Sequence, residues 1–172
     1  MLNVCGDGLK RSVATGGDVR SLWISGVVLI LDQVSKRMVM ESMFLGESIP
    51  VLGSFFRLTY IQNPGAVFGL RLGGNVAHLV FAGLALILVA VMWLRLPAHE
   101  RVASAGLALV LGGAIGNVID RIRFSAVIDF LDFGFGSVRW WVFNVADAAV
   151  TVGAVLLILG CGILKGGKDE AV

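Results

Sequence analysis

The chain has 172 residues, of which 57% are apolar and only 15% are charged. Soluble domains usually carry about 25% charged residues, so this composition indicates an integral membrane protein. The net charge of +2 is too small to favour a nucleic-acid partner. The two cysteines and two histidines show no metal-binding spacing, so we expect no metal and no other cofactor.

A polar tail precedes the first apolar segment. Residues 1–20 are glycine-rich and polar, and we interpret them as disordered. The predicted cytoplasmic tail covers residues 1–21. A helix from Leu22 to about Met43 would be long enough to cross a membrane. Asp32 and Lys36 lie one helical turn apart, hence on one face. A plain ion pair and a substrate-contacting role are both open for these two residues.

The next segment, residues 44–74, is different in character. It alternates apolar and polar residues between glycine and proline turns, which predicts a small β element outside the hydrocarbon. The sequence Asn63-Pro64-Gly65 within it is a turn signal. Asn63 could also present its amide to a peptide backbone.

Three further spans are predicted at about 76–94, 102–119 and 142–164, followed by a tail over 165–172. Gly112 and Gly116 are four residues apart and predict a close helix-packing face. Residues 122–139 form a second polar excursion, and Trp140-Trp141 after it is typical of an interfacial anchor.

Four spans place both termini on one side of the membrane. The tails and the 95–101 turn carry seven lysines and arginines, and the other side also carries seven, or five without the motif residues Lys36 and Arg121. This weak excess predicts cytoplasmic termini, with residues 44–74 and 122–139 on the outer side.

Two aspartates, Asp129 and Asp147, stand next to apolar segments. An ionisable group at membrane depth costs roughly 2.5–3.5 kcal/mol and therefore indicates function. Two carboxylates that approach each other can share one proton and act as a hydrolytic dyad. Asp147 could instead be a helix N-terminal acid that the macrodipole favours.

Asp120 is a rival candidate for the dyad. Asn117, Asp120 and Arg121 lie on one helical face, and an adjacent Arg121 favours a permanently ionised Asp120. We therefore interpret Asp120 and Arg121 as a pair that holds the end of a helix. Asn144 and Asp147 are three residues apart and project together from the start of the last span.

Five blocks occur in one order along the chain: DQVSK (32–36), NPGAVF (63–68), GGAIGNVIDR (112–121), VIDF (127–130) and FNVAD (143–147). Together they resemble the lipoprotein signal peptidases, the type II signal peptidases of bacteria, over residues 22–164. The resemblance implies four transmembrane helices with a small extracytoplasmic β-cradle in the bacterial cytoplasmic membrane. It also implies an aspartic endopeptidase that cuts diacylglyceryl-modified prolipoproteins just before the lipidated cysteine.

By this resemblance the catalytic aspartates are Asp129 and Asp147. The residues that match supporting or substrate-contacting positions are Asp32, Lys36, Asn63, Gly65, Asn117, Asp120, Arg121 and Asn144. The family often has glycine a few residues before the VIDF block, and this chain departs from that pattern because it has Ser125 there. We expect a monomer whose partners are lipid-modified prolipoproteins and membrane lipids.

The alternative is a small intramembrane ion or proton carrier that uses buried carboxylates as a relay. Such a relay needs acids spread through the depth of the bilayer. Asp120, Asp129 and Asp147 all lie near one end of their spans, which disfavours a relay.

Overall fold

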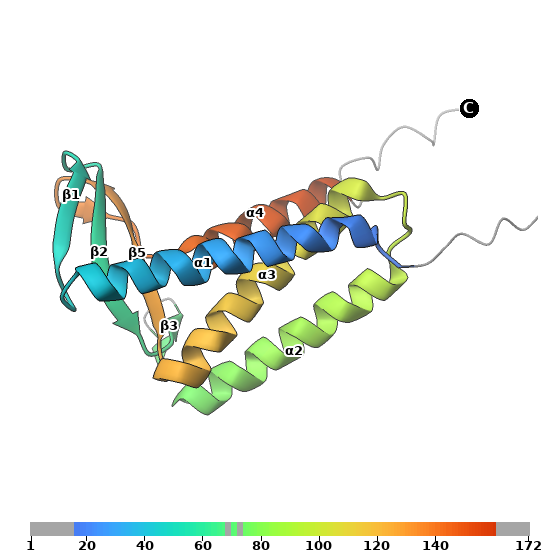
Figure 1. The fold of residues 1–172 in the computed structure, drawn as a ribbon, viewed down its shortest axis with the longest axis horizontal. Helices are drawn as coiled ribbons and strands as arrows, with labels where there is room; N and C mark the ends of the chain where they lie inside the picture. The colour runs from blue at the N-terminus through green and yellow to red at the C-terminus, as the bar shows by residue number, and fades with distance from the viewer. Residues whose placement is uncertain (1–15, 68–69, 72–73, 161–172) are drawn as a thin grey trace, which may run out of the picture.

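In the part of the chain that the structure describes, four α-helices carry a small antiparallel sheet at one end (Figure 1). The structure is a computed structural model, and it describes residues 16–67, 70–71 and 74–160. The helices are α1 (Leu22–Ser42), α2 (Gly74–Arg95), α3 (Arg101–Phe124) and α4 (Val145–Gly160). Residues 16–21 and the end of α4 lie away from the sheet (Figure 1).

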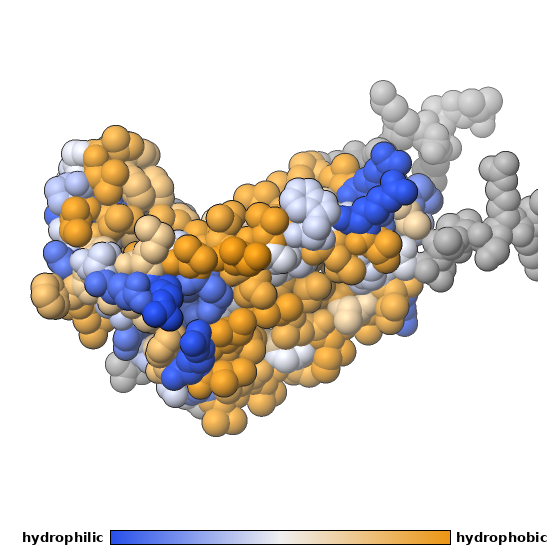
Figure 2. Space-filling view, viewed as in Figure 1, coloured by the Kyte–Doolittle hydropathy of each residue, from blue (hydrophilic) through white to orange (hydrophobic). Residues whose placement is uncertain are grey.

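The helices present an apolar outer surface. In the described part of the chain, α2 and α3 are long and apolar enough to cross a membrane, and α4 is a shorter apolar helix. Helix α1 also exposes large apolar side chains, among them Trp23, Ile30 and Met38. Figure 2 shows these hydrophobic surfaces along the helices, with hydrophilic side chains gathered toward the two ends of the bundle.

Two helix boundaries differ from the sequence prediction. Helix α3 continues to Phe124 instead of ending near residue 119, and it stops where Ser125 adopts a left-handed conformation with φ 56°. Helix α4 begins at Val145 instead of about residue 142, because Asn144 caps it. Asp120 and Arg121 therefore lie within the helix, and the predicted helical position of these two residues is confirmed. Residues 161–172, which include the predicted second tail, lie outside the described residues.

The N-terminal tail begins to fold earlier than predicted. Residues 1–15 lie outside the described residues, but Val19–Ser21 form a short 3-10 helix, η1. The backbone amides of Gly16 and Gly17 donate to the carbonyl oxygens of Leu96 (3.0 Å) and Trp93 (2.9 Å). The prediction of disorder is therefore wrong for residues 16–20, because the end of α2 supplies their hydrogen-bond partners.

The sheet combines both of the predicted excursions. Its order is β1 (Ser48–Leu52), β2 (Phe56–Asn63), β5 (Val127–Phe135) and β6 (Val138–Arg139), and a separate hairpin pairs β3 (Ala66–Val67) with β4 (Leu70–Arg71). The sequence predicts β structure only in residues 44–74. Strand β5, which lies in the second excursion, shows that this prediction was incomplete. Strand β2 is an inner strand, so its backbone needs hydrogen-bond partners on both edges, and β1 and β5 supply them.

A small apolar core fixes the sheet to the end of α1. Val39 and Met43 of α1 pack with Tyr60 of β2 and with Ile128 and Phe130 of β5. Successive side chains of a strand point to opposite faces. The residue between Ile128 and Phe130 therefore projects away from this core, and that residue is Asp129.

Glycines on α3 allow two neighbouring helices to approach closely. A Cβ atom at Gly112 would lie 2.7 Å from the carbonyl oxygen of Ser25 on α1, and one at Gly116 would lie 2.5 Å from Oδ2 of Asp32. The predicted packing face of Gly112 and Gly116 is therefore confirmed, and its partner is α1. Gly113 lies on the other side of α3, where a Cβ atom would meet the carbonyl oxygen of Ala146 on α4.

Gly113→Ala should lower the stability of the protein by roughly 1–3 kcal/mol, because the added methyl group forces the α3 and α4 backbones apart. Gly83→Ala on α2 is the matched control, since nothing lies within 4 Å of the methyl group there. Alanine is the better helix former, so Gly83→Ala should be neutral or slightly stabilising. Thermal unfolding of both variants in detergent tests the contrast, and equal unfolding temperatures would contradict it.

Candidate active site

Asp129 is the central acid of the site. It lies on β5 and is only 2% exposed. Its two carboxylate oxygens accept hydrogen bonds from two amides: Asn63 Nδ2 donates to Oδ2 (3.1 Å), and Asn144 Nδ2 donates to Oδ1 (2.7 Å). The two donors come from β2 and from the start of α4, so three elements meet at this carboxylate.

The register of the sheet brings Asn63 to Asp129. Ile61 pairs with Asp129 and Asn63 pairs with Val127, which places Asn63 and Asp129 as diagonal neighbours on one face. A bulge in β2 precedes this register, because Leu58 still pairs with Leu131 and one extra residue follows in β2. Without the bulge, the side chains of β2 would exchange faces beside Asp129.

The start of α4 holds Asp147 in a reciprocal cap. Asn144 is the N-cap residue, and its Oδ1 accepts from the backbone N of Asp147 (2.9 Å). In return, Oδ2 of Asp147 accepts from the backbone N of Asn144 (3.3 Å). This is a capping box built from asparagine and aspartate. Asp147 is therefore an N-terminal helix acid, as one alternative proposed, and it also faces the site.

A short backbone bridge sets the cap beside β5. Leu131 N donates to the carbonyl oxygen of Phe143 (2.7 Å), and Phe143 N donates to the carbonyl oxygen of Leu131 (3.1 Å). The residue after Phe143 is Asn144, which thus contacts both acids: its side chain donates to Asp129 and its backbone donates to Asp147.

Asn117 on α3 joins the site from the third side. Its Nδ2 donates to Oδ1 of Asp147 (2.8 Å). Its Oδ1 accepts from Asn144 Nδ2 (3.2 Å) and from Lys36 Nζ (3.0 Å). The Asn117 amide therefore connects Lys36 of α1 directly to Asp147 and, through Asn144, to Asp129.

Behind Asn117 lies a buried charged cluster. Lys36 Nζ lies 2.8 Å from Asp32 Oδ2 and 2.7 Å from Asp120 Oδ2, and all three side chains are at most 2% exposed. Asp32 Oδ1 accepts from the backbone N of Ala146, next to Asp147 (2.9 Å). The i,i+4 pair predicted for Asp32 and Lys36 is confirmed. The expected partner of Asp120 was wrong, because the cation that Asp120 pairs with is Lys36 and not the adjacent Arg121.

Arg121 lies on the side of α3 that faces the two acids. Its NH1 donates to the carbonyl oxygen of Asn117 (3.4 Å), and its side chain is half-buried. The carboxylates that act on it electrostatically are those of Asp147, Asp129 and Asp120. Arg121 thus supplies a positive charge beside the two acids and is not confined to holding the helix end.

Gly65 lies beside Asn63 and packs against His78 at the start of α2. Gly65 N donates to Asn63 Oδ1 (3.0 Å), and Gly65 has a φ of +109°. A Cβ atom at Gly65 would collide with the imidazole ring of His78, whose Nδ1 lies 2.7 Å from the carbonyl oxygen of Gly74. A cavity of about 290 Å³ opens beside this contact, between the turn and the start of α2. No local pattern in the sequence connects His78 with Gly65.

Asp132 is a second acid on β5 that sequence reasoning missed. It is buried and accepts from Thr59 Oγ1 (2.7 Å) and from Arg139 Nε (2.6 Å), while Arg139 NH1 donates to the carbonyl oxygen of Ser54 (2.8 Å). These bonds tie the strands together and involve neither Asp129 nor Asp147. Asp132 is therefore a structural acid three residues from Asp129.

The site can do acid–base chemistry. Burial, and after it the charge of Asp147, raise the pKa of Asp129 to about 7, against the opposing hydrogen bonds from Asn63 and Asn144. The Asp129 carboxyl therefore holds its proton until the pH rises to about 7, and the carboxyl group of Asp147 lies close enough to act on it. Within the described residues, no group of three or more His, Cys, Asp and Glu side chains is arranged to hold a metal ion.

The comparison with known families identifies a related family. Residues 24–163 match the family described as signal peptidase (SPase) II, Peptidase_A8. The chain is 44% identical over 145 residues to the lipoprotein signal peptidase of Desulforapulum autotrophicum, covering 81% of this chain and 90% of that protein. It is 45% identical over 151 residues to the lipoprotein signal peptidase of Burkholderia mallei, covering 86% and 90%.

Solved structures agree with this similarity. A bacterial membrane enzyme determined by the in meso method at 2.3 Å resolution superposes with a TM-score of 0.82 at 27% identity, covering 92% of this chain and 98% of that chain. A second such structure, at 1.9 Å resolution, gives a TM-score of 0.79 at 28% identity, covering 90% and 99%.

Proposed function

The chain belongs to the signal peptidase II family, and we propose that Asp129 and Asp147 are its catalytic dyad. The protein is an aspartic peptidase that removes signal peptides from prolipoproteins. The observation that supports the assignment of the dyad is the position of Asn144, which donates to Asp129 through its side chain and to Asp147 through its backbone. Membership of this peptidase family argues against the alternative of an ion or proton carrier.

The two acids have different roles in hydrolysis, one as general base and the other as general acid. The ionised carboxylate takes a proton from a water molecule, and the resulting hydroxide attacks the carbonyl carbon of the scissile bond. The protonated carboxyl stabilises the oxyanion and then gives its proton to the leaving amine. Asn63 and Asn144 hold Asp129, and Asn117 holds Asp147, so neither carboxylate needs to rotate into place. No cofactor or metal enters these steps.

The substrate we propose is a diacylglyceryl-modified prolipoprotein, cut just before its lipidated cysteine. Four helices would cross the bacterial cytoplasmic membrane with both termini in the cytoplasm, and the sheet would lie as a cradle at the outer face. The apolar surfaces of α1 to α4 and the exposed pair Trp140-Trp141 beside the sheet support this placement. The protein is proposed to act as a monomer.

One experiment tests the substrate. The purified full-length protein in detergent is incubated with one prolipoprotein, either lipidated or unlipidated, and the products are identified by mass spectrometry. We expect cleavage of the lipidated form only, giving a product that begins with the lipidated cysteine. Equal cleavage of both forms would contradict the lipid requirement, and a folded enzyme that cleaves neither form would contradict the function.

The rate of cleavage should fall above about pH 7. Asp129 loses its proton there, and two ionised carboxylates leave no acid for the leaving amine. We expect kcat/KM to fall up to tenfold per pH unit on the alkaline side. A kcat/KM that keeps rising to pH 9 would contradict the shared proton.

The raised pKa of Asp129 also makes the stability of the protein depend on pH. The native pKa of Asp129 is raised, so its contribution to stability is fully present below its unfolded pKa of about 3.9 and is lost as pH rises through about 7. The slope is at most about 1.4 kcal/mol per pH unit. In Asp129→Asn this part of the pH dependence should disappear, which thermal unfolding at pH 5 and pH 8 would show.

A further inference from the structure

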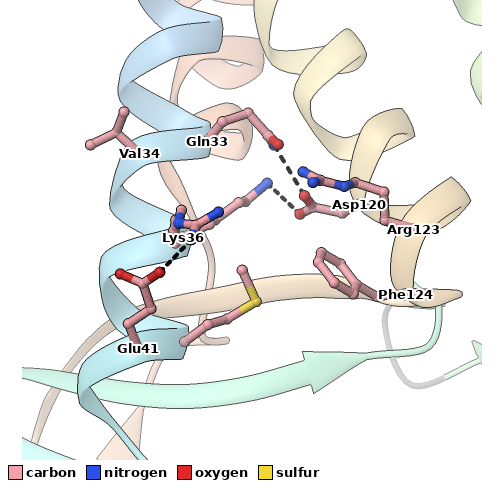
Figure 3. Close-up of a pocket in the computed structure, with 9 residues that line it drawn as sticks. Gln33, Val34, Lys36, Glu41, Asp120, Arg123 and Phe124 are labelled. Atoms are coloured by element: carbon pink, nitrogen blue, oxygen red, sulfur yellow. Dashed lines mark hydrogen bonds and ion pairs between the residues drawn. The ribbon is translucent and has the colours of Figure 1, made fainter.

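A second cavity lies between α1 and α3 at the sheet end of the bundle. It has a volume of about 290 Å³. Its walls combine apolar and charged side chains: Val34, Arg37, Met40, Glu41, Arg123 and Phe124. In Figure 3, Lys36 of α1 and Asp120 of α3 point toward each other inside it, with Phe124 beyond them. The mechanism above does not use this cavity.

The rim of the cavity carries excess positive charge. Arg123 is exposed, and in the described part of the chain its recorded contact is with the ring of Phe124, 5.8 Å from the guanidinium carbon. Arg37 lies 2.7 Å from Glu41, but these side chains are 72% and 61% exposed, and such a pair is weak. The rim therefore carries two guanidinium groups, of Arg37 and Arg123, and one carboxylate, of Glu41. Lys36 does not add to this excess, because it pairs with both Asp32 and Asp120. The buried cluster behind the rim therefore carries a net charge of −1, and the positive charge available to a ligand is that of the two exposed arginines.

The surface next to the rim is apolar. Ile30, Leu31 and Val34 expose more than half of their side chains on α1, on the way from the cavity toward the middle of the bundle. Figure 2 shows the hydrophilic patch over the ends of α1 and α3, with hydrophobic surface continuing along the helices. A ligand that fits both parts has an anionic head and an apolar tail. Basic side chains at the end of an apolar helix are suited to such a head group.

We propose that this cavity binds an anionic glycerophospholipid from the leaflet on the side of the sheet. The phosphate lies between Arg37 and Arg123, and an acyl chain follows Val34 and Met40 along α1. The site lies on the opposite side of the buried cluster from the dyad, because Lys36 reaches Asn117, which in turn holds Asp147. The proposal does not depend on the peptidase activity.

Lipid binding to the full-length protein tests it directly. The protein is delipidated in a neutral detergent, and bound lipids are counted by native mass spectrometry during titration with phosphatidylglycerol or with phosphatidylcholine of the same acyl chains. We expect tighter binding of phosphatidylglycerol. Arg37→Gln and Arg123→Gln should each weaken it about fivefold, which corresponds to roughly 1 kcal/mol per basic residue. Arg95→Gln, the same change at an exposed arginine at the far end of α2, should leave it unchanged.

Glu41→Gln gives a test in the opposite direction. It removes the carboxylate that competes for Arg37, so phosphatidylglycerol should bind several-fold more tightly while phosphatidylcholine is unaffected. The unfolding temperature of each variant is measured as well, and binding is compared only among variants that unfold at the temperature of the unaltered protein. A folding defect is then not mistaken for lost binding. Equal binding of the two lipids, unchanged binding in the Arg37→Gln/Arg123→Gln double variant, or displacement by inorganic phosphate at the concentration of the lipid would each overturn the proposal.

Discussion

Asp129→Asn and Asp147→Asn should each abolish prolipoprotein cleavage while the protein still folds. Either change removes a group that must exchange a proton, and we expect kcat to fall roughly 10³-fold or more. The shape of the side chain is kept, so the bonds from Asn63 and Asn144 to position 129 are only partly lost. Cleavage of a lipidated prolipoprotein and thermal unfolding in detergent are measured on the same preparation.

Asp132→Asn is the matched control for these two variants. Asp132 is also a buried acid of β5, but its partners are Thr59 and Arg139, away from the dyad. This change weakens the pairing with Arg139 and should lower the unfolding temperature, while kcat stays within a few-fold when it is measured below that temperature. Substantial activity in Asp129→Asn or in Asp147→Asn would refute the dyad, whatever the control shows.

Lys36→Met should produce the largest loss of stability. It leaves the carboxylates of Asp32 and Asp120 buried without their cation, and breaking a buried ion pair in this way costs roughly 3–5 kcal/mol. The three residues join α1 to α3, and Asp32 also accepts from the backbone at the start of α4, so the loss should loosen all three helices. Thermal or denaturant unfolding in detergent measures it.

The neighbouring residue supplies the control. Arg37→Gln removes a positive charge one position along α1, but Arg37 and its partner Glu41 are mostly exposed, so stability in a neutral detergent should hardly change. The double variant Lys36→Met/Asp120→Asn has one stranded carboxylate instead of two and should recover part of the loss. If Lys36→Met unfolds at the temperature of the unaltered protein, the cluster does not hold the helices together.

Local spacing by itself determined several features of this protein. The apolar runs located all four helices, because a helix that crosses a membrane needs about 20 predominantly apolar residues. The spacing of four predicted that Asp32 and Lys36 share a face, and the spacing of three predicted the same for Asn144 and Asp147. Gly112 and Gly116 marked a packing face by the same periodicity. The five motif blocks indicated the family and, through it, the two acids.

Only the tertiary structure decided which of these faces meet. Asp120 pairs with Lys36, 84 positions away in the chain, and not with Arg121, because successive residues on a helix point in different directions. Strand β5 joins β2, and the bulge in β2 sets Asn63 on the face of Asp129. His78 packs on Gly65 across two elements. These pairings depend on the crossing of helices and on strand register, so they connect residues that no local pattern relates.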